Sequence, residues 1–228
     1  MHDEELKVAG VTSIRTVPEG PVRAWQLVYA PDAGSDVHDP FGTLLSEQLA
    51  EHGISTVRFQ FPYQETGLRR PDRSPVLEAT WLGVLDACRI DGVRLIASGR
   101  SMGGRIASIV ASKGALVDGL ALFAYPLHPP KRPELARTVH LAEIPVPRLF
   151  CSGTRDAFGT AENSPRQQRR SLTRRCTCWR APTTGSRCRS PVVAPATTCG
   201  MTRSPVCSPG PTSGSMPDEE LLHARGRR

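Results

Sequence analysis

The segment from Gly99 to Gly104, with the sequence G-R-S-M-G-G, holds the residues best suited to chemistry. In the pattern G-x-S-x-G, glycines two residues before and after a serine let neighbouring backbone approach a strained turn, so that the hydroxyl stands exposed where a helix begins. The N-terminus of that helix and the Met102 N–H can stabilise a developing oxyanion. We therefore predict that Ser101 is a nucleophile; the alternative is an ordinary glycine-rich turn between a strand and a helix.

The elements around this segment follow from the spacing of apolar and turn residues. Strands that alternate with helices at this spacing favour right-handed crossovers and an α/β fold with a doubly wound, mostly parallel sheet. Ligands of such sheets bind at the C-terminal ends of the strands. The predicted strands cover residues 23–29, 54–61, 93–97, 116–124 and 148–152, the predicted helices cover 40–52, 75–88, 101–113 and 135–142, and a polar loop covers 62–74.

Several motifs occur in the order expected of one known family. They are YAPDAGS (29–35), RFQFPY (58–63), RPDRSPVLEATW (70–81), GRSMGGRIAS (99–108), FAYPLHPPKRPE (123–134) and SGTRDAFGT (152–160). Through them residues 22–160 resemble the α/β-hydrolase superfamily. The resemblance is to its small dienelactone-hydrolase-like group, which includes the hydrolase-like domain of NSL complex subunit three and its testis-expressed relatives.

The resemblance implies a catalytic triad with Ser101 as the nucleophile and Asp156 as the acid. The chain order agrees, because this fold places the serine first, the acid second and the histidine last; a carboxylate that caps a loop is the alternative for Asp156. The resemblance also implies that the Met102 and Ala33 N–H groups form the oxyanion hole. Asp32 departs from the family pattern, and its carboxylate would oppose a developing negative charge unless it points to solvent.

The triad base is missing from the expected place. A serine hydroxyl needs an imidazole to take its proton, and only His223 follows Asp156 in the chain. The other candidates, His38, His52, His128 and His140, all precede Asp156. His128 could approach the site, but we interpret it as a histidine of a surface loop.

The charge of the chain is divided unevenly. Residues 1–162 carry 17 basic and 19 acidic residues, whereas residues 163–228 carry 12 arginines and 3 acidic residues. Residues 163–217 contain no acid, a single leucine, and eight residues each of proline, serine and threonine. So little apolar surface cannot offset the entropy of ordering the backbone, and we expect a disordered tail.

Three functions for this tail are weakly supported. A metal site would use five cysteines that lack the usual C-x2-C spacing and a nearby histidine. A nucleic-acid-binding arm would have charge but only one aromatic residue, Trp179, for stacking, and a disulfide-rich module is uncommon without an export signal. The five cysteines are Cys176, Cys178, Cys188, Cys199 and Cys207. We therefore expect no metal, no nucleic acid partner and no cofactor.

A frameshift near Glu162 explains the tail better. If each codon begins on the third base of the present one, the segment Arg175–Arg187 can encode L-H-V-L-E-G-A-D-H-G-F-A-V, a strand followed by a polar turn. The histidine of G-A-D-H-G-F would lie at the codon that spans Thr183 and Thr184, where the family has its base. We hypothesise that the chain leaves its original reading frame near Glu162, which removes the base, the last strand and the closing helix.

Other polar residues have simpler interpretations. Arg69, Arg70 and Arg73 could bind an anionic substrate, although a solvated charged loop is the more common arrangement. Cys88 and Cys151 fit helix and strand patterns, and we expect both to be buried structural thiols.

These observations divide the chain into an N-terminal segment (1–20), an incomplete hydrolase-like domain (21–162) and a tail (163–228). No apolar run reaches the ~18 residues that span a bilayer, and the polar N-terminus does not resemble a signal peptide, so we expect a cytoplasmic protein without membrane contact. The expected function is that of a serine hydrolase for an ester or related acyl compound, impaired in this chain. A non-catalytic scaffold for protein interaction is the alternative, and the residues do not indicate an oligomeric state.

Overall fold

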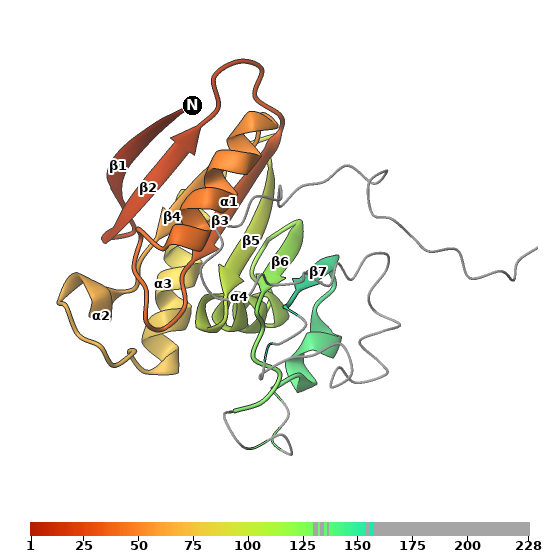
Figure 1. Cartoon of the computed structure of the whole chain (residues 1–228). Helices are drawn as coiled ribbons and strands as arrows, with labels where there is room; N and C mark the ends of the chain where they lie inside the picture. Colours follow the sequence, from red (N-terminus) through yellow and green to blue (C-terminus); the bar gives the residue numbers. More distant parts are fainter. Residues whose placement is uncertain (130–131, 133–134, 136, 154–155, 157–228) are drawn as a thin grey trace, which may run out of the picture. The chain divides into compact units, whose positions relative to one another are not determined.

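The computed structural model describes residues 1–129, 132, 135, 137–153 and 156. These residues contain a seven-stranded sheet with the order β1-β2-β4-β3-β5-β6-β7 (Figure 1). The pairs formed by β3 with β4 and β5, by β5 with β6, and by β6 with β7 are parallel, which confirms the predicted doubly wound, mostly parallel sheet. The strands are β1 (His2–Val8), β2 (Val11–Val17), β3 (Trp25–Ala30), β4 (Ser55–Phe59), β5 (Arg94–Arg100), β6 (Gly119–Phe123) and β7 (Arg148–Cys151).

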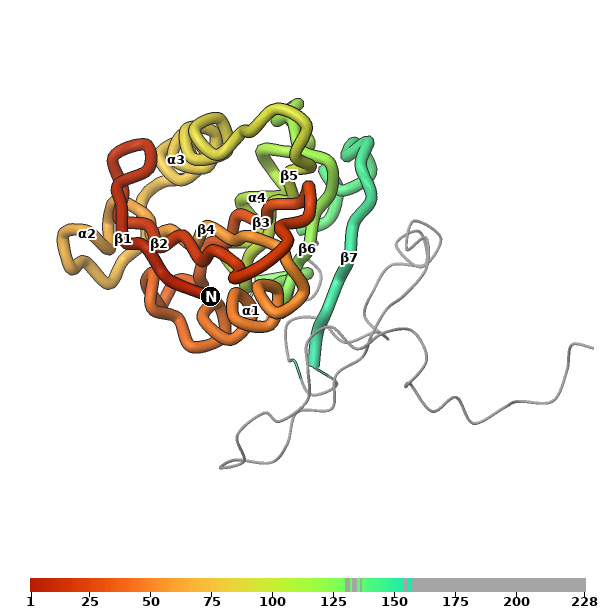
Figure 2. Tube along the Cα trace, turned by 90° about the horizontal axis from the view of Figure 1, so that it is seen from above, coloured from red at the N-terminus to blue at the C-terminus, as the bar shows by residue number. Residues whose placement is uncertain are grey.

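Helices cover both faces of this sheet. Figure 2 shows α1 and α3 on opposite sides of the strands, as expected for right-handed crossovers that alternate between the faces. The helices are α1 (Pro40–Glu51), α2 (Pro62–Glu65), α3 (Ser74–Ala87) and α4 (Met102–Ser112), and a short 3-10 helix, η1, covers Val139–Glu143.

The larger core cluster lies beneath α3 and α4. Four apolar residues of α3 at helical spacing, Leu77, Trp81, Val84 and Leu85, are buried. The Trp81 ring meets the Phe59 ring edge-on with 4.8 Å between the centroids, and its indole N–H donates to the Gly103 carbonyl over 3.2 Å. Burial of such large aromatic rings contributes much of the stability of a small core, so α3 fixes the position of the turn that precedes α4.

The N-terminal residues form a hairpin that the sequence pattern did not predict. The strands β1 and β2 pair in antiparallel register, and β2 joins the sheet through β4. A two-residue turn connects them, in which Ala9 and Gly10 have φ values of 49° and 84°. The strands were missed because β1 is exposed along most of its length and β2 buries the polar side chains of Ser13 and Thr16, which hides the alternation of apolar and polar residues.

Two further differences concern helices. The helix predicted over 135–142 is the 3-10 helix η1, because Pro145 and Pro147 follow closely and the backbone before a proline disfavours the α conformation. The loop predicted over 62–74 contains the short helix α2 at its start.

The predicted tail, residues 163–228, and the proposed frameshift lie outside the described residues. In the described part of the chain, no helix combines the length and apolarity needed to cross a membrane.

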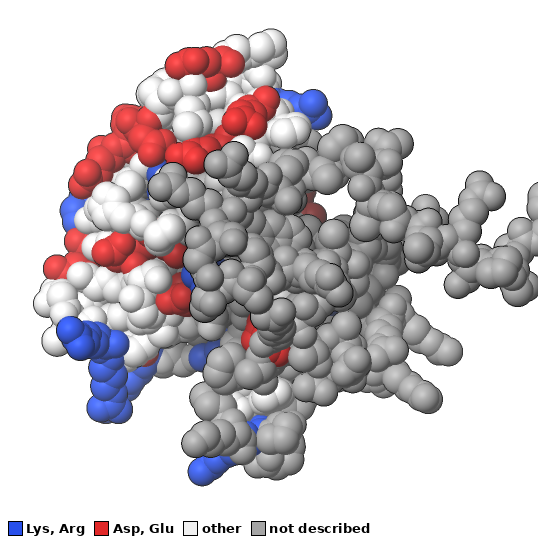
Figure 3. All heavy atoms as spheres, viewed as in Figure 1, with Lys and Arg blue, Asp and Glu red and all other residues white. Residues whose placement is uncertain are grey.

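Figure 3 shows acidic side chains gathered over the β1–β2 hairpin and α1, with few basic ones among them. The described residues over these elements therefore do not share the basic character of the whole sequence.

Candidate active site

Ser101 occupies a strained backbone position between β5 and α4. Its φ is 49°, a value in the left-handed region that side-chain-bearing residues rarely adopt. Its carbonyl accepts the first hydrogen bond of α4 from the Arg105 N–H at 3.0 Å, and its own N–H donates to the Phe123 carbonyl of β6 at 2.9 Å. Hydrogen bonds to α4 and β6 therefore maintain this strained conformation. Ser101 itself is half-buried at the N-terminus of α4.

The glycines around Ser101 allow close backbone approach. A Cβ atom on Gly99 would lie 2.5 Å from the Gly104 nitrogen, and one on Gly103 would lie 2.2 Å from the Ala30 carbonyl oxygen and 2.5 Å from that of Pro31. No side chain fits at these distances. The geometry thus confirms the tight turn predicted from the sequence, and it places the end of β3 directly against the start of α4.

The loop that follows β3 lies beside this turn. The Tyr63 hydroxyl donates to the Ala33 carbonyl over 3.1 Å, and the Gly34 N–H donates to Asp32 Oδ1 over 2.8 Å. Burial raises the pKa of Tyr63 above its ordinary value, so the hydroxyl keeps its proton for this bond. Within the described part of the chain, no hydrogen bond uses the N–H of Ala33 or of Met102.

Arg100 joins this loop to α1. Its Nη1 atom lies 3.5 Å from Asp32 Oδ2 and 3.6 Å from Asp39 Oδ1. Asp39 is buried and caps α1 by accepting from the Gly42 N–H at 3.1 Å. Its other partner is the Tyr29 hydroxyl, whose pKa is raised by burial and by the bond to Asp39. The guanidinium of Arg100 therefore compensates the negative charge of Asp32 beside the predicted oxyanion donors.

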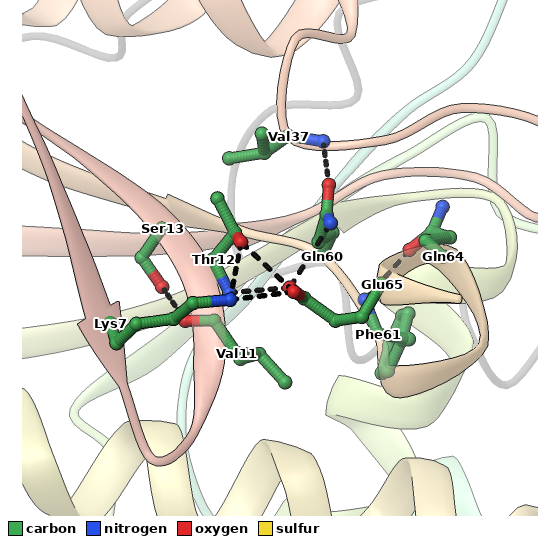
Figure 4. Close-up of polar contacts among 9 residues, drawn as sticks. All are labelled: Lys7, Val11, Thr12, Ser13, Val37, Gln60, Phe61, Gln64 and Glu65. Carbon is green, nitrogen blue, oxygen red and sulfur yellow. Dashed lines mark hydrogen bonds and ion pairs between the residues drawn. The ribbon is translucent and has the colours of Figure 1, made fainter. Parts of the chain in front are cut away.

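A second polar network holds the hairpin against the loop after β4 (Figure 4). Glu65 accepts from Lys7 Nζ at 2.6 Å, from the Thr12 N–H at 2.6 Å and from Gln60 Nε2 at 3.0 Å. Partial burial favours the protonated acid, but these donors outweigh it and lower the pKa of Glu65 to about 2. Gln60 in turn accepts from the Val37 N–H at 3.4 Å. The network thus reaches from the first hairpin to the loop that contains Asp32 and Ala33.

The end of β6 connects the serine turn to the strand that precedes Asp156. Phe123 accepts from the Ser101 N–H, and the next residue, Ala124, donates to the Cys151 carbonyl at 2.8 Å. Ala124 also has a positive φ, of 45°. Asp156 is half-buried, and its N–H donates to the Gly153 carbonyl at 3.0 Å. Ser101 and Asp156 therefore follow the C-terminal ends of β5 and β7, two strands that both pair with β6.

The histidines occupy other places. His128, interpreted from the sequence as a surface residue, is in fact buried, with 8% of its surface exposed. His140 is half-buried, and its Nε2 atom lies 2.9 Å from Ser108 Oγ. His38 and His52 are exposed. Among the described residues, no histidine forms a hydrogen bond with Ser101.

The remaining candidates have no common site. Arg69, Arg70 and Arg73 are exposed. Cys88 is buried, which raises the pKa of its thiol to about 11, whereas Cys151 is only half-buried and so corrects the prediction of a buried thiol there. In the described ranges no group of histidine, cysteine and acidic side chains could hold a metal ion.

Sequence reasoning missed Arg100, Asp39 and Tyr63. Arg100 is the variable residue of the G-x-S-x-G pattern, so the motif itself gives it no role. Asp39 was detectable, because an aspartate directly before Pro40 and an apolar helical pattern is a typical N-cap. For Tyr63 the sequence contains no signal, since its bond to Ala33 joins residues 30 positions apart.

Comparisons with known proteins agree with this geometry. The sequence matches the family described as alpha/beta hydrolase domain over residues 23–180. An α/β serine hydrolase homologue from Coxiella burnetii is 20% identical, with a TM-score of 0.55 over 78% of this chain and 83% of that one. A lidless α/β serine hydrolase from Xanthomonas campestris is 19% identical, with a TM-score of 0.59 over 80% and 84%.

A putative dienelactone hydrolase from Klebsiella pneumoniae is also similar. It is 18% identical, with a TM-score of 0.55 over 75% of this chain and 80% of that one. No functionally curated protein matches the sequence. At these identities the solved structures establish the fold, and the family match covers more than half of the chain.

Proposed function

The chain belongs to the α/β-hydrolase family, and from this premise we propose that it derives from a serine hydrolase that cleaves an ester or related acyl compound. Ser101 would attack the acyl carbon, and the Met102 and Ala33 N–H groups would stabilise the oxyanion that forms. The main support is the strained φ of 49° at Ser101, because such strain persists only where the surroundings impose it and concentrates at active sites.

Asp156 would orient the triad base and stabilise its charged form. In this role the carboxylate accepts a hydrogen bond from the imidazole, which then takes the Ser101 proton and later returns it to the leaving group. The positions of Ser101 and Asp156 after the C-terminal ends of β5 and β7, the two strands that flank β6, support this assignment. Ser101 is bonded to β6, and Asp156 comes five residues after the end of β7.

In this chain we expect little or no turnover, since the proposed frameshift near Glu162 would place the residue that acts as the base in the other reading frame. Without an imidazole, the hydroxyl of Ser101 is a weak nucleophile at neutral pH.

Two experiments test the proposal. A fluorophosphonate probe is applied to the chain as it stands, to a version with one nucleotide inserted near codon 162, and to that version carrying Ser101→Ala. Labelling of the restored version alone is the expected result; equal labelling of both restored versions would reject Ser101 as the nucleophile.

Resequencing the DNA across codons 155–175 tests the frameshift separately. An unbroken frame, with third bases that do not encode D-H-G-F, would reject it. Failure to label any version would instead favour a scaffold without catalytic activity.

A further inference from the structure

We propose that Arg100 is a positioning residue that neutralises Asp32 and thereby holds the loop of residues 31–35 in a form compatible with negative charge at Ser101. This inference rests on the proposed function, because the charge in question is that of the oxyanion. It concerns only residues that the structure describes.

The need for neutralisation arises from the position of Asp32. The proposed oxyanion donor, the Ala33 N–H, belongs to the peptide group that links Asp32 to Ala33. A carboxylate attached to the same peptide raises the energy of any nearby anion, and the effect grows in a partly buried site where the effective dielectric constant is low. An uncompensated Asp32 would therefore act against the oxyanion hole.

The geometry supplies a partner for each oxygen of Asp32. Oδ1 accepts from the Gly34 N–H at 2.8 Å, and Oδ2 lies 3.5 Å from Arg100 Nη1. Because Arg100 directly precedes Ser101, its guanidinium is tied to the backbone of the nucleophile turn. Its side chain is 41% exposed and that of Asp32 is 24% exposed, so solvent screens the pair only in part.

The same guanidinium also compensates Asp39. Nη1 lies 3.6 Å from Oδ1 of this buried carboxylate, an oxygen that has no hydrogen bond among the described residues. Two carboxylates thus share one guanidinium. This stoichiometry argues against Arg100 as a binding site for an anionic group of the substrate, and it favours a role in holding the loop after β3, the start of α1 and the turn at Ser101 together.

Hydrogen–deuterium exchange of the full chain tests this role without requiring turnover. In Arg100→Gln, we expect the amides of residues 32–35 to exchange about fivefold faster, the upper end of what a partly exposed ion pair contributes. Asp32→Asn retains the oxygen that accepts from Gly34 and removes only the charge. Added to Arg100→Gln, it should return exchange in this loop to within about twofold of the wild type.

Rescue by Asp32→Asn is the decisive result, since a purely structural role through Asp39 would not be relieved by neutralising Asp32. Arg94→Gln, on the same strand but stacked on Trp25 at 5.0 Å, is the matched control and should leave the loop unchanged. Arg100→Lys, which keeps the charge, should show a smaller effect than Arg100→Gln. It also replaces Arg100→Gln as the test variant if that protein does not fold.

Three outcomes would overturn the proposal: unchanged loop exchange in Arg100→Gln, no rescue by Asp32→Asn, or equal effects of lysine and glutamine at position 100. Because none of these measurements involves labelling of Ser101, their failure is distinct from failure of the proposed function.

Discussion

The two edges of the sheet are attached to its centre by different chemistry. At one edge, charged groups hold the β1–β2 hairpin: Glu65 bonds to Lys7, and the buried Arg58 lies 2.9 Å from Asp3. At the opposite edge, next to β7, an uncharged cluster ties η1 to α4 through His140 and Ser108. Ion pairs of acidic side chains weaken only in strong acid, whereas a buried neutral histidine begins to lose its contribution to stability as the pH falls below the ordinary histidine pKa of 6.5. The two edges should therefore lose stability in different pH ranges.

The largest effect is expected at the centre that both edges share. Gly103→Ala places a Cβ atom 2.2 Å from the Ala30 carbonyl oxygen, so α4 must move away from β3. We expect a loss of about 3 kcal/mol or more in the free energy of unfolding, measured by urea denaturation. Gly34→Ala is the control, because its Cβ would meet only Asp32 Oδ1 at an ordinary 3.6 Å. A similar cost for both substitutions would contradict the close packing of the turn.

Ser108→Ala tests the edge next to β7. The buried hydroxyl of Ser108 lies 3.0 Å from the Tyr125 hydroxyl and 2.9 Å from His140 Nε2, so its removal leaves two polar groups without this partner. The expected cost is about 2 kcal/mol. Ser112→Ala is a matched control on the same helix, since both hydroxyls bond to the carbonyl three residues earlier and only Ser108 bonds to other elements. Equal costs would show that the cluster contributes nothing to stability.

Glu65→Gln tests the hairpin edge. The pKa of Glu65 in the folded protein, about 2, lies below its ordinary value of 4.5. Its charge therefore stabilises the fold fully above pH 4.5 and loses this effect as the pH falls towards 2. We expect Glu65→Gln to cost about 1.5 kcal/mol at pH 7, because several hydrogen bonds to a charged group are weakened, and to reduce the loss of stability in acid. Glu78→Gln, which removes a single ion pair with Lys113 rather than a network of donors, should cost less; the reverse order would refute the comparison.

The smallest effect concerns the pH range of His140. Burial and the nearby Arg105 lower the pKa of His140 below its ordinary 6.5, although Glu143 acts in the opposite direction. The neutral form is thus favoured in the folded state, so the contribution is complete above pH 6.5 and declines as the pH falls through that value. The wild type should lose free energy of unfolding between pH 7.5 and 5.5, and His140→Gln should make this loss smaller by less than about 1 kcal/mol, as measured by thermal denaturation at both pH values. The exposed His52→Gln serves as the control, and an identical pH profile for His140→Gln and the wild type would remove the difference between the edges.

The parts of the fold that the sequence predicts are those with a local cause. The turn at Ser101 is prescribed by its own glycines, and the central strands are apolar because helices cover both of their faces. The family resemblance extended this to the placement of Asp156 after β7. In each case, residues that are close together in the sequence determine the local structure.

The parts that the sequence did not predict depend on distant contacts. The hairpin is stabilised by Glu65 and Arg58, which lie more than 50 positions from their partners Lys7 and Asp3. The burial of His128 is also not indicated by the loop-like sequence P-L-H-P-P around it. The role of Arg100 is likewise invisible locally, since its two acidic partners follow a different strand.

The sharing of one guanidinium by Asp32 and Asp39 also makes the effects of substitutions at positions 32, 39 and 100 depend on one another. Asp39 caps α1 and is buried, so with Arg100 beside it the chain tolerates a second acid at position 32 with little penalty. A chain with both acids but without Arg100 would have two carboxylates and no guanidinium beside Ser101. Substitution of Arg100 should therefore cost more while Asp32 is present than after Asp32→Asn.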